Sequence, residues 1–237
     1  MKCIFRWFVK FDTNLITNTQ MIKKLFQVLL AVGIVALVYV VYSQIANPLK
    51  FEDEFNSRKK EVVNRIQIIR EAERMYKSKY QRFTGSFDTL VNFVLTENME
   101  GERKKYDEDD SVAMAKLGKN EKNIETYTYS VKDSLVSKIN RTLNIKLDNE
   151  GIKDMRYVPF TDNKVEYALD AGFTTASEIV IPVVWCRVPY KDFLDTVKYR
   201  QEVVNLIDNE LNTMNKSYAG VMFGSLEVAN NEAGNWE

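Results

Sequence analysis

Residues 25–49 read LFQVLLAVGIVALVYVVYSQIANPL and contain no charged side chain. As an α-helix over residues 25–46, this run would be roughly 33 Å long at about 1.5 Å per residue, which matches a hydrocarbon core of about 30 Å. The sequence therefore predicts one transmembrane helix over residues 25–46. Apolar side chains expected within this span include Leu25, Val28, Leu29, Val35, Leu37 and Val41.

Two other interpretations of this run fit less well. A cleaved signal peptide has an apolar core of about 7–15 residues and ends in a small-x-small site, whereas this run is longer and residues 43–46 read SQIA. A buried core helix is the second alternative. We therefore expect an uncleaved signal anchor.

The charges that flank the run predict its orientation. Only Asp12 offsets the bases that precede the run, and the first base after it is Lys50. The positive-inside rule then places the N-terminus in the cytoplasm and residues 47–237 outside. We expect a single-pass protein of the cytoplasmic (inner) membrane whose main domain lies in the periplasm. The preceding bases are Lys2, Arg6, Lys10, Lys23 and Lys24.

Residues 1–24 are expected to form a short cytoplasmic stub. Met21 begins the segment MIKKLFQVLL, which is itself a natural start for an anchored protein. Residues 1–20 are therefore either part of the protein or an upstream start that the cell does not use. Both alternatives leave the predicted topology unchanged.

Composition excludes several classes of function. Beyond the run, 28 of the 33 bases and 32 of the 33 acids remain, so this part has a net charge near −4 and no basic stripe. Such a surface argues against nucleic acid as a partner. The chain has no histidine, which excludes histidine general acid–base catalysis, Ser-His-Asp sites and most zinc sites.

Neither the two cysteines nor the acidic residues predict a reactive or metal-binding site. Cys3 and Cys186 are expected on opposite sides of the membrane and cannot pair, and Cys186 is expected to be a small buried apolar residue. The acidic run 107–110 is no EF-hand, because Val112 and Gly118 stand where Gly and Glu are required. We predict no catalytic, cofactor-binding or metal-binding residues, no cofactor and no enzymatic activity.

A long amphipathic helix is expected after Pro48, which should break or bend the first helix. Over residues 55–83, apolar residues recur in steps of three and four, with Lys59 and Glu73 as polar interruptions. We expect this stripe to pack on a sheet of its own domain, with a coiled coil or another partner as the alternative. The candidate interaction stripe comprises Phe55, Val62, Ile66, Ile69, Tyr76, Tyr80 and Phe83.

The segment after this helix begins with a turn and a second helix. Gly85 predicts the turn, and Ser86 is a candidate N-cap for a short helix that closes over the first. Apolar content then falls, and the mixed charges predict an exposed, mobile charged loop near residues 97–123.

Strand patterns dominate the following part of the chain. Residues 124–131 alternate as a strand, and residues 178–188, EIVIPVVWCRV, predict a central strand with an irregularity at Pro182. A helix is then expected over at least residues 201–213. The fold class is therefore α+β, with an N-terminal transmembrane helix and a long amphipathic helix packed on a mostly antiparallel sheet. Apolar residues at helical spacing in the last segment are Phe193, Val197, Val204, Ile207, Leu211 and Met214.

A basic stub, one apolar helix, an amphipathic continuation to about Phe83 and a strand-rich domain resemble the plan of type IV pilins and type II secretion pseudopilins. The prepilin cleavage motif is absent, because no Gly-Phe follows Lys24 and no Glu lies five residues into the run. The stretch RKKEVVNRIQIIREAERMYKSKYQRFTGSFDTLVNFV and the ending GSLEVANNEAGNWE are similar to a group of single-pass envelope proteins from Bacteroidota. That similarity implies a cell-envelope setting and no activity.

Two functions are compatible with these features. The first is a structural or assembly protein of the envelope that works through protein contacts, with the lipid bilayer and other envelope proteins or further copies of itself as partners. The second is a ligand-binding or sensory ectodomain, for glycan among other ligands, which would use the exposed members of Tyr76, Tyr80, Phe83, Tyr127 and Tyr129. Trp236, in a polar tail, either docks on the domain or anchors a partner.

Overall fold

The computed structural model describes residues 2–107, 109, 112, 122–176 and 178–237, with side chains from residue 23 onward. The chain divides into two compact units, Met1–Asp53 and Glu54–Glu237. Helix α1 (Lys2–Tyr80) supplies the described residues of the first unit and the first element of the second.

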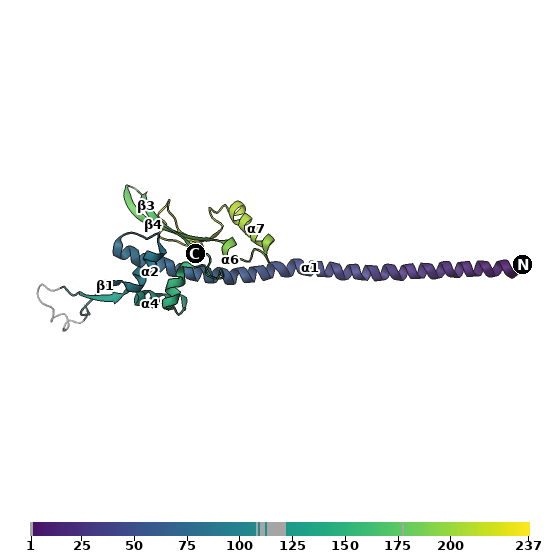
Figure 1. Cartoon of the computed structure of the whole chain (residues 1–237), viewed down its shortest axis with the longest axis horizontal. Coiled ribbons are helices and arrows are strands. Elements are labelled where there is room, and N and C mark those ends of the chain that lie inside the picture. Colours follow the sequence, from purple (N-terminus) through teal and green to yellow (C-terminus); the bar gives the residue numbers. More distant parts are fainter. Residues whose placement is uncertain (1, 108, 110–111, 113–121, 177) are drawn as a thin grey trace. The chain divides into compact units, whose positions relative to one another are not determined.

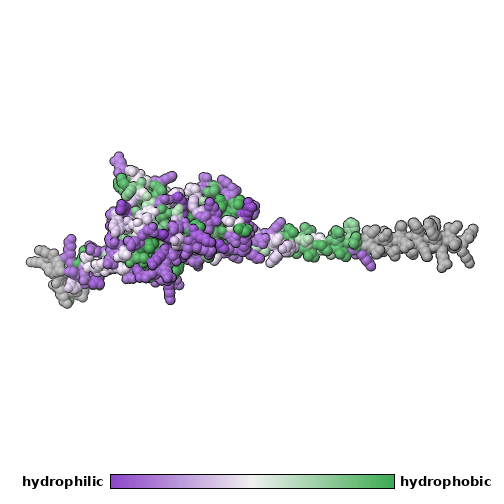
Figure 2. Space-filling view, viewed as in Figure 1, coloured by the Kyte–Doolittle hydropathy of each residue, from purple (hydrophilic) through white to green (hydrophobic). Residues whose placement is uncertain are grey.

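The first unit is helical throughout the described residues, and its apolar surface is uncovered. The six side chains expected within the span have exposed fractions of 55% to 69%. Figure 2 shows this part of the helix as a continuous hydrophobic surface. Within the described residues, one helix, Lys23–Tyr80, is long and apolar enough to cross a membrane. The unit is therefore compatible with a membrane span or a signal anchor.

Pro48 does not end the first helix, contrary to the break that the sequence suggested. It lies inside α1, which continues as helix to Tyr80. A proline inside a helix removes one backbone hydrogen bond and costs about 3 kcal/mol. Long helical stretches on both sides retain their own hydrogen bonds, so the helix persists despite this local loss.

The second unit is an α+β domain built around residues 54–80 of α1. Figure 1 shows a sheet on one side of this helix and α2 and α4 on the other. The sheet has the order β3-β4-β5 and both pairings are antiparallel. After α1, the elements are α2 (Phe87–Thr96), β1 (Asn98–Arg103), β2 (Glu125–Ser130), α4 (Val131–Leu143), α5 (Asn149–Lys153), the 3-10 helix η1 (Asp154–Arg156), β3 (Ala168–Ala176), β4 (Ile179–Pro189), α6 (Tyr190–Phe193), α7 (Arg200–Asp208), the π-helix η2 (Asn209–Thr213) and β5 (Gly220–Gly224).

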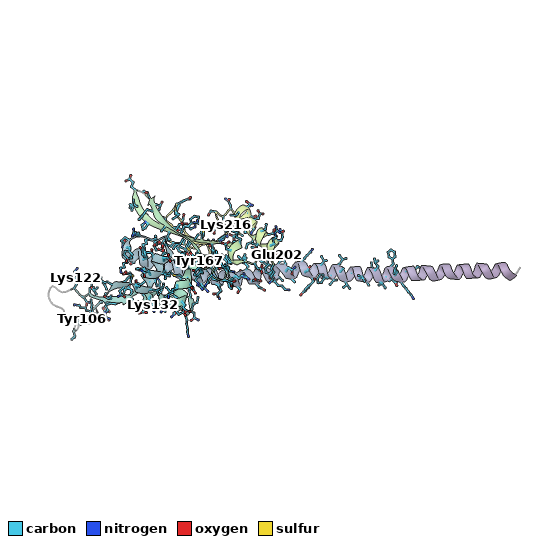
Figure 3. All side chains as sticks on the ribbon, viewed as in Figure 1. Tyr106, Lys122, Lys132, Tyr167, Glu202 and Lys216 are labelled. Atoms are coloured by element: carbon cyan, nitrogen blue, oxygen red, sulfur yellow. The ribbon has the colours of Figure 1, made fainter. Side chains whose placement is uncertain are left out.

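The core forms where β3 and β4 cover α1. Leu169 pairs with Cys186 in the β3–β4 register, and both side chains are buried. Tyr167, labelled in Figure 3, donates its hydroxyl to the backbone oxygen of Val62 at 3.1 Å. On the other side, the rings of Tyr76 and Phe93 of α2 meet edge to face, with centroids 5.1 Å apart. Cys186 is fully buried, as expected.

Several predicted elements are present. The strand predicted at residues 124–131 is β2, and the predicted central strand is β4, which lies between β3 and β5. Pro182 is accommodated because β5 pairs only with residues 185–189 of β4. Ser86 occupies the N-cap position of α2, although its side chain makes no capping bond.

The predicted charged loop at residues 97–123 requires a correction. Its first part forms β1, which pairs antiparallel with β2. The charged side chains do not prevent this pairing because both faces of the hairpin are largely exposed, and Arg103 forms an ion pair with Glu125 at 2.9 Å. The rest of the predicted loop falls mainly on residues 108, 110–111 and 113–121, which lie outside the described part of the chain.

Candidate interaction surfaces

The candidate interaction stripe of α1 lies mostly inside the domain. Five of its members, Val62, Ile66, Ile69, Tyr76 and Phe83, are buried. Phe55 is half-buried and its ring lies edge to face with Tyr190 at 5.5 Å. Tyr80 is the exposed member, at 42%. The stripe therefore forms the core of its own domain, and a partner must bind elsewhere.

Glu73 is the polar group within this buried face. The backbone N–H of Thr84 donates to its Oε2 at 3.0 Å, while its Oε1 is buried without a partner. Burial raises the pKa of Glu73 to about 8, because removing the carboxylate from water disfavours the charged form. At neutral pH the side chain is therefore mostly a neutral acid that holds the turn between α1 and α2. Burial also raises the pKa of the neighbouring Cys186, which leaves it an inert thiol.

A second face of α1 binds the tail of the chain. Glu232 accepts from Arg74 Nε at 3.4 Å and from Lys77 Nζ at 3.1 Å. The guanidinium of Arg70 lies 5.4 Å from the ring centre of Trp236 and pairs with Glu237 at 2.5 Å. Trp236 therefore docks on its own domain.

The β3–β4 hairpin carries the first exposed apolar surface. We define the hairpin tip as Phe173, Ile179 and Val180, whose exposed fractions are 62%, 65% and 65%. Over residues 171–184 the sequence contains a single charged side chain, Glu178. Figure 2 shows the apolar surface at this end of the domain.

A groove runs beside the same hairpin. It has a volume of about 320 Å³ and lies between residues 82–85 and 171–173, with Tyr76, Phe83 and Thr89 also lining it. Gly85 packs closely on β3, since a Cβ there would lie 3.3 Å from the Ala171 nitrogen. Among the described residues, β3 pairs only with β4, so residues 172–176 form a sheet edge.

Helix α7 carries the second exposed apolar surface, which the sequence did not lead us to expect. We define the α7 stripe as Val197, Val204, Ile207, Leu211 and Met214. Ile207 is half-buried and the other four are exposed.

The adjoining face of this segment packs on the domain through Val203 and Glu210. Glu210 accepts from Lys216 Nζ at 2.9 Å and from the Tyr190 hydroxyl at 3.4 Å. The apolar spacing in the sequence identified the stripe, but it could not show that the stripe faces outward.

The aromatic residues considered for a ligand do not form one exposed platform. Tyr76 and Phe83 are buried in the core. Tyr127 and Tyr129 lie next to each other on β2, with ring centroids 5.7 Å apart, and Arg103 lies over the Tyr127 ring. Tyr127 also packs on Gly101 of β1.

Comparison with known proteins adds no assignment to these surfaces. Across the described residues, no group of three or more Cys, Asp or Glu side chains is arranged to hold a metal ion. No family model matches the chain, and neither a curated protein nor a solved structure matches it.

Proposed function

We propose that this protein is a structural or assembly component of the cell envelope that acts through protein–protein contacts rather than catalysis. Residues 25–46 anchor it in the inner membrane as an uncleaved signal anchor, with residues 1–24 in the cytoplasm and residues 47–237 in the periplasm. The uncharged, exposed helix of the first unit and the basic residues before it support this topology.

The observation that carries the proposed function is the exposed hairpin tip. Soluble monomeric proteins rarely expose contiguous apolar patches larger than a few hundred Å², and larger patches mark interaction sites. Natural sheet edges are usually protected by charges, proline or bulges. Residues 172–176 read GFTTA and contain none of these charges or prolines. The tip and the adjacent edge therefore fit a partner protein.

The place of the hairpin within its domain supports a protein partner over lipid. Gly85, just beyond the end of α1, packs on β3. The helix from Glu54 to Tyr80 is about 39 Å long at about 1.5 Å per residue. The hairpin is thus held at the end of the domain that is far from Glu54. Glu54 is the first residue of the domain after the anchor.

Site-specific photocrosslinking in intact membranes tests this proposal. A benzophenone amino acid in place of Val180 should form an adduct with an identifiable envelope protein or with a second copy of the chain. The control carries the same probe in place of Arg141, an exposed residue of α4, and should form no such adduct. Ile179→Asp should abolish the adduct at position 180. Equal adducts at both positions, or none at position 180, would contradict the proposal.

The anchor is tested separately by membrane extraction. If residues 25–46 span the bilayer, the chain should stay in the membrane pellet after alkaline carbonate washing and should be released only by detergent. Release by carbonate alone would contradict the anchor without bearing on the hairpin.

A further inference from the structure

The α7 stripe has a regular spacing and a fixed direction. Its members follow one another in steps of seven, three, four and three residues. Val204 and Ile207 lie on α7, Leu211 lies in the π-helix η2 with Met214 just after it, and Val197 lies in the turn before α7. Val197, at its start, is 92% exposed. Asp195 fixes this position, because its Oδ1 accepts from the backbone N–H groups of Val197 and Lys198 at 3.0 and 2.9 Å.

The helix cannot easily turn this stripe inward. Val203, directly before Val204 in the chain, is buried, and Glu210 accepts hydrogen bonds from Tyr190 and from Lys216, which is labelled in Figure 3. Rolling the helix would expose Val203 and break both bonds of Glu210. The outward direction of the stripe is therefore a stable property of the domain.

Two contacts fix the start of the stripe to the first residues of the domain. Lys198 Nζ donates to Glu54 Oε2 at 3.0 Å, and Arg58 Nη1 donates to the Phe193 oxygen at 2.8 Å. Glu54 follows Ala46, the last residue of the predicted span, by only eight positions. Eight residues reach at most about 29 Å even when fully extended. The covalent chain alone therefore keeps this part of the domain within that distance of the end of the span.

We propose that the α7 stripe lies on the outer surface of the bilayer in which the chain is anchored, with its apolar side chains among the lipid acyl chains. The inference rests on the proposed anchor. Because the tether confines the stripe to the neighbourhood of the membrane, lipid is present there at a high effective concentration. An amphipathic helix in this setting buries its apolar face in the headgroup and acyl boundary.

The charges around the stripe fit this placement at one end. Lys191, Lys198 and Arg200 are exposed near its start, where they can approach lipid phosphates. Asp208 is the exposed acid on α7, and Glu202 is half-buried on another side of the helix. Apolar contact, rather than a net positive charge, would therefore provide most of the attraction. A second copy of the chain is the other occupant that the heptad-like spacing fits, and the experiment separates the two.

Depth-dependent fluorescence quenching on the full chain tests the inference. Cys3→Ser removes one native thiol, and the buried Cys186 stays unlabelled. An environment-sensitive dye is attached at Val204→Cys, with Asn205→Cys, the exposed neighbour outside the stripe, as the matched control. Both proteins are reconstituted in vesicles of phosphatidylethanolamine and phosphatidylglycerol that contain spin-labelled lipid.

The dye at position 204 should show a blue shift and about twofold stronger quenching than the dye at 205, since an interfacial helix is buried about 5–10 Å at this boundary. Equal quenching at the two positions overturns the inference. Weak quenching of the labelled protein, together with a 204–204 disulfide dimer when the unlabelled Val204→Cys protein is treated with a mild oxidant, also overturns it and assigns the stripe to a second copy. A chain that does not float with the vesicles refutes the anchor, whereas a chain that floats without quenching at 204 refutes only the α7 contact.

Discussion

Two apolar stripes with the same helical spacing have opposite surroundings in this domain. On α1, the side chains of Val62, Ile66 and Ile69 are fully buried. Four of the five side chains of the α7 stripe are exposed, and Val203 and Glu210 beside them pack inward. Spacing thus predicts which side chains share a face of a helix, but the elements packed around that helix determine whether the face is covered.

The largest expected effect concerns Glu73, the acid within the covered stripe. Its pKa is raised from 4.5 to about 8, so the folded state binds this proton more tightly than the unfolded state. Its stabilising contribution is complete below about pH 4.5 and is lost as the pH rises through about 8. Between these values the loss approaches about 1.4 kcal/mol per pH unit.

Urea denaturation at a series of pH values measures this loss. Glu73→Gln keeps an oxygen for the Thr84 N–H but cannot ionise. The unfolding free energy of the wild type should decline relative to that of the variant between pH 4.5 and 8. Parallel curves for the two proteins would show that Glu73 is not a buried acid.

A matched pair of alanine variants compares the two stripes directly. Ile66→Ala, on α1, should lower the unfolding free energy by about 2–5 kcal/mol, because it leaves a cavity in the core. Leu211→Ala, in η2, should cost less, about 1 kcal/mol, because the side chain is already 38% exposed. Chemical denaturation in detergent gives both values, and similar losses would show that the α7 stripe is covered.

An intermediate effect is expected where α1 binds the tail. Glu232 has a backbone φ of +54°, in the left-handed region, and is held there by Arg74 and Lys77. Both cations are partly exposed, so Glu232→Ala should cost about 1–2 kcal/mol, near the lower end for hydrogen bonds to charged groups. Glu227→Ala, at an exposed position nearby in the chain, is the control for the same denaturation measurement. Equal stabilities of the two variants would show that the tail is not held by this contact.

The smallest effect on stability is expected at Val204. Val204→Asp should change the unfolding free energy in detergent by less than about 0.5 kcal/mol, as for other surface substitutions. Val203→Asp, one position earlier, should be strongly destabilising because it buries an unpaired charge. If both variants unfold the domain, the assignment of the two faces of α7 is wrong.

Much of the fold was predictable because its elements carry local signals. The alternation in residues 124–131 identified β2, and the apolar run around Cys186 identified the central strand β4. The charged residues of β1 gave no such signal. A strand that is exposed on both faces needs no apolar alternation, so its pairing with β2 was not apparent from the sequence.

The exposed surfaces were harder to predict, for a different physical reason. The hairpin tip had a signal that the sequence analysis did not use, namely the scarcity of charge over residues 171–184. The outward direction of the α7 stripe had no such signal in the sequence. It depends on the burial of Glu210, whose carboxylate accepts hydrogen bonds from Lys216 and Tyr190. An acid within a helix ordinarily predicts the exposed face instead.

The contact between α1 and the tail also constrains the order in which the domain is completed. Arg70 donates to the backbone oxygen of Glu232, 162 positions later in the chain. Contacts that are this far apart in sequence form late, because the intervening chain must first be made and brought together. Until the tail has been synthesised, the face of α1 that carries Arg70, Arg74 and Lys77 must therefore stay uncovered. During that interval the nascent domain would be a natural client for a chaperone.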